Sequence, residues 1–306
     1  MSAPLKIQYL THYQIDKAKW DDCIGKADNG LIYAYSFYLD QMSKNWDALV
    51  LNDYAAVMPL TWNRKYGINY LYQPFLTAQL GVFGNKITEE QVGTFIQSIP
   101  SSFRFIDIAL NSGNISGVPT GFSIHRSNYV LDLNNSYAEL YKGYRENIKR
   151  NIKKANQLGC RVERDFDAGK VIELALQQME GYGKESAYNV DRFRKLYTYL
   201  HEKKMATTYG ISLNEELLAS CVFFFSHKRA YYILVGNHPN GKTIGASHAL
   251  IDAFIKDHAG EYMSLDFEGS DIRNLAFFYA SFGAKQEVYP ALKINRLPFY
   301  LKWLKN

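Results

Sequence analysis

The segment that decides the fold reads YMSLDFEGSDIRNLAFFYASFGAKQEVYPALKI and runs from Tyr262 to Ile294. Its apolar spacing predicts a strand over 262–267, a helix over 274–282 and a strand over 288–294. The elements expected before it are strands over 206–213, 217–225 and 230–235 and a helix over 244–259. Hairpin strands followed by alternating strands and helices indicate a mixed sheet rather than an all-parallel one.

A capping box marks the clearest helix start, at Ser136, because Glu139 stands three residues further on. We expect this helix to run to about Leu158 and to stop at Gly159. Shorter helices are expected over 170–180 and 190–204.

The first half of the chain also alternates strands and helices. Strands are expected over 5–10, 48–51, 55–62, 69–72, 103–110 and 129–133, and helices over 15–27, 36–44 and 88–99. Thr88 is the expected cap of the last helix. The predicted fold class is α/β (α+β), with residues 1–134 and 135–306 as two domains.

Composition agrees with two ordinary globular domains, because 306 residues rarely share one core. The net charge of +5 suits an anionic ligand, such as a phosphate-bearing cofactor, but is too small to establish nucleic-acid binding. Three scattered cysteines indicate no disulfide framework. We expect a cytoplasmic protein, because no signal peptide and no membrane span can be identified.

A phosphate-loop motif, G-x-x-x-x-G-K-[ST], is matched by the residues from Gly236 to Thr243. Too little chain follows it to complete the sheet of such a nucleotide-binding domain, and the strands before it form hairpins. Pro239-Asn240-Gly241 is also an ordinary turn signal. A protein that binds a nucleotide through this loop is therefore our least favoured hypothesis.

Three stretches carry a family resemblance: residues 144–155 (YRENIKRNIKKA), 265–270 (LDFEGS) and 278–284 (FYASFGA). Together with 73–75 (QPF) and 79–83 (QLGVF), they resemble the FemAB-like branch of the GNAT (acyl-CoA N-acyltransferase) superfamily. The resemblance implies tandem GNAT-type domains, each with a mixed, mostly antiparallel sheet flanked by helices. It also implies transfer of an acyl group from acyl-CoA, or of an aminoacyl group from aminoacyl-tRNA, to an amine.

The resemblance implies a donor site where two parallel strands splay apart, with the diphosphate at the N-terminus of the next helix. The GNAT loop pattern [R/Q]-x-x-G-x-[G/A] is met here by Lys242-Thr243-Ile244-Gly245-Ala246-Ser247, where Lys replaces Arg and Ser replaces the last small residue. The expected donor-binding residues are Leu234, Val235, Gly241, Lys242, Thr243, Ile244, Gly245 and Ala246.

Three side chains are candidates for the chemistry of transfer. Tyr279 could protonate the leaving group, or it could be an ordinary packed tyrosine. Asp266 and Glu268 share one face of a strand, so one could accept the amine proton. Alternatively, they could bind Arg273 or cap the following helix together with Ser270 or Asp271.

Arg145, Arg150 and Lys154 belong to a basic helix face that could contact phosphates, although a solvated face is the commoner explanation. The spacing of His248 and His258 excludes a shared helix face, so we expect no metal site. The preferred partner is a small-molecule or peptide amine acceptor, such as a cell-wall precursor; a tRNA partner is less favoured, and oligomeric state is open. The second hypothesis is a non-catalytic tandem-GNAT binding module.

Overall fold

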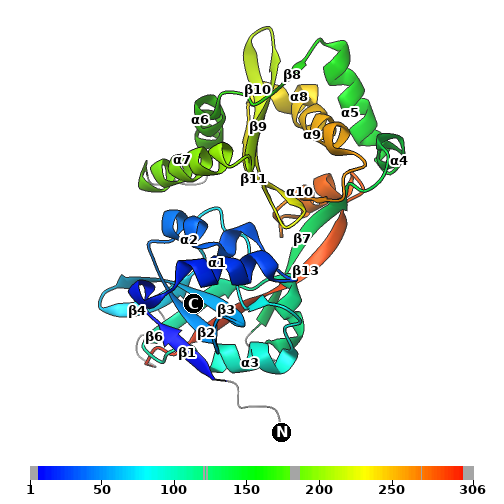
Figure 1. Ribbon diagram of the computed structural model, residues 1–306. Helices are drawn as coiled ribbons and strands as arrows, with labels where there is room; N and C mark the ends of the chain where they lie inside the picture. The colour runs from blue at the N-terminus through cyan, green and yellow to red at the C-terminus, as the bar shows by residue number, and fades with distance from the viewer. Residues whose placement is uncertain (1–5, 120, 122, 180–186, 270, 299–306) are drawn as a thin grey trace. The chain divides into compact units, whose positions relative to one another are not determined.

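The computed structural model describes residues 6–119, 121, 123–179, 187–269 and 271–298. The chain forms two compact units, one of residues 1–126 with 288–306 and the other of residues 127–287 (Figure 1). It passes from unit 1 to unit 2 within strand β7 (Ser123–Asp132) and returns within β13 (Lys285–Asn295). The domain boundary expected between residues 134 and 135 stays a prediction.

Unit 1 is built on a sheet in the order β1-β2-β3-β4-β6-β13. Only the β4–β6 ladder is parallel among its described pairs. Its strands are β1 (Ile7–Leu10), β2 (Asn45–Leu51), β3 (Ala56–Lys65), β4 (Ile68–Tyr72), β5 (Phe83–Gly84, paired with β3) and β6 (Phe103–Ala109). Its α-helices are α1 (Lys17–Lys26), α2 (Ser36–Met42) and α3 (Glu89–Gln97).

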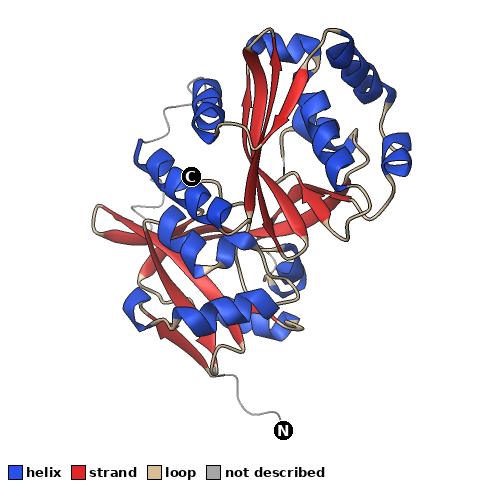
Figure 2. Cartoon of the chain, turned by 45° about the horizontal axis from the view of Figure 1, so that its top comes forward, coloured by secondary structure: helices blue, strands red, loops and turns tan. Residues whose placement is uncertain are grey.

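Unit 2 has the strand order β7-β12-β11-β10-β9-β8, with a parallel β11–β12 pair. Its further strands are β8 (Arg161–Arg164), β9 (Ala206–Leu213), β10 (Glu216–Ser226), β11 (Arg229–Asn237) and β12 (Ser264–Asp266). Its helices are α4 (Tyr137–Lys142), α5 (Glu146–Gln157), α6 (Ala168–Met179), α7 (Ala187–Glu202), α8 (Pro239–Ile244), α9 (Ala246–His258) and α10 (Arg273–Ala280). Figure 1 shows α6 and α7 on one face of β9–β11 and α9 on the other, and Figure 2 shows the same flanking by helices.

Several local predictions are confirmed by the structure. The Ser136 side chain accepts a hydrogen bond from the backbone N–H of Glu139, whose carboxylate accepts one from the Ser136 N–H in return. Thr88 and Gln91 form the same capping box at α3. Gly159 ends the following helix with a φ of 85°.

The single helix expected from Ser136 to Leu158 is wrong, because the structure has α4 and α5 with a break between them. Gly143 is a poor helix former, and Arg145 adopts an extended backbone whose N–H donates to the carbonyl of Ser281. The helix expected over 244–259 likewise begins two residues later, at Ala246, and is preceded by the separate helix α8. Both breaks turn out to position the candidate site.

The apolar core of unit 2 includes the inner faces of β10 and β11, α5 and α9. Large rings dominate it: Phe223 stacks on Phe254 with ring centroids 3.7 Å apart. Aromatic packing accounts for part of the high tyrosine and phenylalanine content. No helix in the described part of the chain combines the length and the apolar character that crossing a bilayer requires.

Candidate functional site in unit 2

Strands β11 and β12 pair over a short distance, and the ladder ends where β12 ends. Their parallel ladder begins at Arg229↔Ser264 and ends at Tyr231↔Asp266. Beyond Tyr231, β11 continues to Asn237 and remains paired with β10 on its other side. The β12 side of residues 232–237 therefore has no ladder partner from β12. This unpaired side lies beside Leu234, and a divergence of the two strands at that point stays a prediction.

The corresponding parallel pair in unit 1 behaves differently. Strands β4 and β6 pair from Asn69↔Phe103 to Tyr72↔Asp107, and Tyr72 is the last residue of β4. The ladder thus includes the last residue of β4, so no part of β4 extends beyond the ladder. In unit 2 the strand that ends with the ladder is β12, and β11 is the strand that continues beyond it for six residues, 232–237.

A β-bulge lies at the start of the part of β11 that extends beyond the ladder. Val222 pairs with Leu234 while Phe223 pairs with Tyr232, so Ile233 is the extra residue. Such bulges re-aim side chains and occur often beside active sites. Leu234 is 4% exposed and Val235 packs at the edge of the core, so both contribute backbone and apolar wall rather than polar groups.

The junction between α8 and α9 requires glycine at position 245. Gly245 has a φ of 84°, and a Cβ there would lie 2.8 Å from the carbonyl oxygen of Asn151 on α5. The next helix begins at Ala246, and no hydrogen-bond acceptor for the N–H groups of Ala246 and Ser247 is found among the described residues. First-turn N–H groups of this kind favour anions.

The phosphate-loop motif does not form an open loop. His238 caps α8, so Gly241, Lys242 and Thr243 are helical. The glycines permit close packing: a Cβ on Gly236 would lie 2.7 Å from the Ala175 backbone nitrogen, and one on Gly241 would lie 2.4 Å from the Leu218 carbonyl oxygen. Close contacts with neighbouring backbone therefore explain the two glycines of the motif.

The structure brings the basic face of α5 to the α8–α9 junction. The Lys154 ammonium donates to the carbonyl of Thr243 at 2.8 Å, and Arg150 is exposed on the same helix. Arg145, at the start of α5, instead lies over the ring of Phe277 on α10, 4.6 Å from its centroid. Of the three expected phosphate contacts, Lys154 therefore lies at the expected donor loop, although the two are far apart in the sequence.

His248, in the first turn of α9, was missed as a site residue. Its Nε2 lies 3.1 Å from the side-chain nitrogen of Asn151, and its ring meets Phe278 edge-on at 4.9 Å. Burial lowers the pKa of His248 to about 4, so the ring is neutral at pH 7. No sequence pattern points to His248, and it is identified only by its contacts with α5 and α10 in the structure.

Asp266 is held by an ion pair. Its Oδ2 lies 2.8 Å from Nη1 of Arg229, and its Oδ1 accepts the N–H of Glu268 at 2.7 Å. Burial raises the pKa of this carboxyl, and the Arg229 guanidinium opposes that shift. Arg229 on the adjacent strand, and not Arg273, is therefore the cation that Asp266 contacts, whereas Arg273 as a partner of Glu268 stays a prediction. Ser270 falls outside the described residues, and Ile272 rather than Asp271 stands at the cap position of α10.

Glu268 and Tyr279 both follow β12, in the loop after the strand and in α10. Glu268 has a φ of 60°, a conformation that its hydrogen bond to Asp266 supports. Tyr279 is 6% exposed and stacks on Phe267 with ring centroids 4.5 Å apart. Burial, and then the charge of Glu268, raise the pKa of the Tyr279 phenol, which therefore stays protonated.

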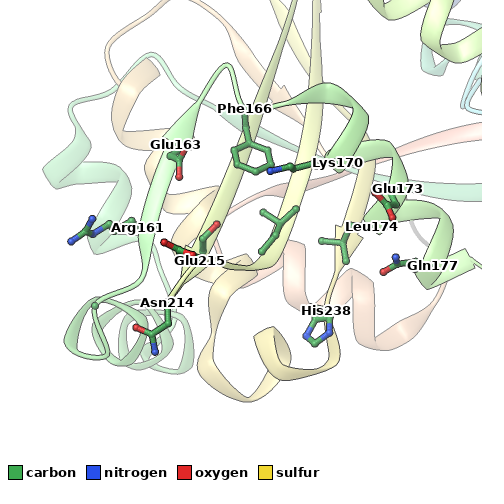
Figure 3. Close-up of a pocket in the computed structure, with 13 residues that line it drawn as sticks. Arg161, Glu163, Phe166, Lys170, Glu173, Leu174, Gln177, Asn214, Glu215 and His238 are labelled. Carbon is green, nitrogen blue, oxygen red and sulfur yellow. The ribbon is translucent and has the colours of Figure 1, made fainter.

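A separate cavity of about 750 Å³ lies beside α6 and includes none of the expected site residues (Figure 3). Glu163, Glu173 and Glu215 reach it from three different elements, and Phe166 and Leu174 contribute apolar surface. Its residues form no motif in the sequence, so no sequence signal indicated it. Within the described residues, no cluster of three or more His, Cys, Asp or Glu side chains could hold a metal ion.

Comparison with known proteins agrees with this geometry. Residues 142–272 match the family model described as acetyltransferase (GNAT) domain. The structure of FemX is similar over 97% of this chain and 99% of that one, with a TM-score of 0.67 and 13% identity. A tandem GNAT protein from the clavulanic acid biosynthesis pathway is similar over 96% and 99%, with a TM-score of 0.54 and 10% identity.

The C-terminal domain of an Agrobacterium fabrum protein designated a lysylphosphatidylglycerol synthetase is similar over 92% of each chain, with a TM-score of 0.56 and 9% identity. No curated protein matches the sequence. The predicted tandem GNAT fold is confirmed. The family model therefore identifies a GNAT acetyltransferase domain within residues 142–272, and the similar solved structures show that the chain has the tandem GNAT fold.

Proposed function

We propose that the chain is an N-acyltransferase that moves an acyl or aminoacyl group from acyl-CoA or aminoacyl-tRNA directly to an amine. The observation that carries this proposal is the early end of the β11–β12 ladder, which leaves one side of residues 232–237 without a β12 partner. An extended donor can bind along such an unpaired strand. Its phosphates would then lie between the basic face of α5 and the first turn of α9.

In the proposed reaction, the acceptor nitrogen attacks the donor carbonyl carbon. A C–N bond forms, and the C–S bond of a thioester or the C–O bond of an aminoacyl ester breaks. Glu268 takes the proton that the amine loses, and Tyr279 gives a proton to the leaving sulfur or oxygen. Return of the proton from Glu268 to Tyr279, directly or through solvent, restores both groups.

Asp266 has a different part in this proposal. Because both of its oxygens are engaged, by Arg229 and by the Glu268 N–H, it orients Glu268 rather than touching substrate. The acceptor is proposed to be a small-molecule or peptide amine, such as a cell-wall precursor.

A second candidate, a non-catalytic binding module, is favoured by one observation. Tyr279 is 6% exposed and lies against Phe267, so its hydroxyl is not displayed on an open surface. The two candidates differ in whether product forms.

The test measures donor binding and product together. Acetyl-CoA binding is followed by calorimetry, aminoacyl-tRNA binding by filter retention, and transfer to a panel of amines by mass spectrometry. Replacing Arg150 and Lys154 by Gln should weaken binding of whichever donor is used, because phosphate contacts are lost. Replacing Lys26, an exposed lysine of unit 1, by Gln is the control. Failure to bind either donor would sink the proposal, whereas binding without product supports the non-catalytic module.

A further inference from the structure

Unit 1 contains a cavity of about 660 Å³ that the proposed transfer reaction does not use. It lies beside β1, β2 and the end of β3. Rings form much of its lining: Tyr9, His12, Tyr13, Trp46 and Trp62. Aromatic rings offer a negative face to whatever occupies such a space.

A buried carboxylate without a cationic partner also lines this cavity. Asp47 is 6% exposed, and its oxygens accept hydrogen bonds from the Tyr9 hydroxyl at 2.6 Å and from the His12 backbone N–H at 2.9 Å. Both donors are neutral, and no Lys, Arg or His side chain of the described residues lies within ion-pair distance of it. A buried charge is costly unless it is paired.

The neighbouring carboxylate is already compensated. Asp40 lies 2.7 Å from the Lys17 ammonium and also accepts the indole N–H of Trp46 at 3.0 Å. This hydrogen bond fixes the ring of Trp46, against which His12 packs edge-on at 5.2 Å. The negative charge that remains unbalanced among these groups is therefore that of Asp47.

The aromatic lining is not explained by core packing alone. Tyr13 is 97% exposed, so its ring is presented to solvent at the cavity.

We propose that this cavity binds an organic cation with an apolar body, of the alkylammonium or quaternary ammonium class. The ammonium charge would lie against Asp47, and the alkyl groups would lie against the aromatic rings, which attract cations through their faces. The proposal does not depend on the transfer reaction, because every residue that carries it belongs to unit 1.

Lys44 is the group that opposes such a ligand. It lines the cavity and is exposed, so its ammonium can extend into solvent, yet it still lowers the affinity for another cation. Replacement of Lys44 by Met should therefore tighten binding of a simple cation. An anionic ligand would show the opposite response.

The experiment titrates the full chain with tetramethylammonium chloride and, separately, with tert-butanol, a neutral molecule of similar shape. Binding is followed by calorimetry and tryptophan fluorescence, since Trp46 and Trp62 line the cavity. We expect the cation to bind and the alcohol to bind much more weakly. Equal affinities, or no binding of the cation beyond the effect of sodium chloride, would overturn the proposal.

Two variants locate the binding. Asp47→Asn should weaken tetramethylammonium binding by about tenfold or more, because a charged contact is lost. Tyr13→Ala should weaken it by about twofold to fivefold and cannot harm the core, since the ring is exposed. Asp53→Asn, at an exposed carboxylate of the same unit, is the control and should change nothing. Unchanged affinity in Tyr13→Ala and in folded Asp47→Asn would place any binding elsewhere.

Discussion

The Arg229 guanidinium and the Asp266 carboxylate lie 2.8 Å apart in the short parallel ladder of β11 and β12. Arg229 also reaches Glu287 at 3.1 Å, so one cation balances two carboxylates. Because Asp266 in turn holds the N–H of Glu268, the ion pair connects the paired part of the sheet to the proposed catalytic carboxylate.

Replacing Arg229 by Met should destabilise the protein by about 3–5 kcal/mol, because Asp266 would be left buried without a partner. Urea unfolding followed by circular dichroism measures this change. Lys26→Met removes the exposed ion pair with Asp22 and is the control, which should leave the unfolding midpoint close to that of the wild type. Equal shifts of the unfolding midpoint in the two variants would show that the buried ion pair contributes no more to stability than the exposed one.

Gly245→Ala tests the α8–α9 junction. It combines a left-handed backbone with a Cβ that would lie 2.8 Å from the Asn151 carbonyl, so we expect a loss of about 3 kcal/mol or more. Gly260→Ala is the matched control, since its φ of 85° is the same but nothing lies within 4 Å of the added Cβ. It should cost only about 1 kcal/mol. If the two losses were equal, contact with α5 would not be what requires glycine at 245.

Tyr279→Phe should reduce the turnover of the proposed reaction by about a hundredfold while leaving donor affinity nearly unchanged. The ring and its packing on Phe267 remain, so the fold is retained. Steady-state kinetics with the donor identified by the binding test measure both quantities. Tyr262→Phe, at a tyrosine that is 71% exposed, is the control. Full turnover in Tyr279→Phe would remove the phenol from the mechanism.

His248 should make stability depend on pH. Burial lowers its pKa from 6.5 to about 4 in the folded state, so the unfolded chain binds the proton more readily between these values. The contribution of His248 is therefore intact above pH 6.5 and falls as the pH drops toward 4, by roughly 3 kcal/mol in all. The free energy of unfolding, measured with urea at several pH values in this range, should change less with pH in His248→Gln than in the wild type. Substitution of the exposed His201 is the control, and an unchanged pH dependence in His248→Gln would refute the assignment.

Local signals predicted many of the elements of unit 2 and missed what depends on distant contacts. The capping box at Ser136 and the stop at Gly159 were predicted because both act within a few residues. The break at Gly143–Arg145 was missed, since it rests on a hydrogen bond to Ser281. Strand β8 was also missed, because its residues, RVER, have only one apolar side chain and its pairing with β9 places it.

The residues of the candidate site divide in the same way into those that the sequence indicates and those that depend on distant contacts. The loop around Gly245, the parallel strand pair and Tyr279 could be named from their pattern, although their roles in transfer remain predictions. His248 and Arg229 could not be named, because nothing in their sequence neighbourhood indicates their partners.

The sequence by itself determined the local elements, their caps and the family pattern, because backbone propensity and capping act between residues close along the chain. Only the tertiary structure decided that Arg229 rather than Arg273 neutralises Asp266, and that the basic face of α5 lies at the α8–α9 junction. It also decided that the β11–β12 ladder stops at Tyr231 while the β4–β6 ladder runs to the end of β4. Such pairings depend on how whole sheets and helices pack, and packing is set by all of these contacts together.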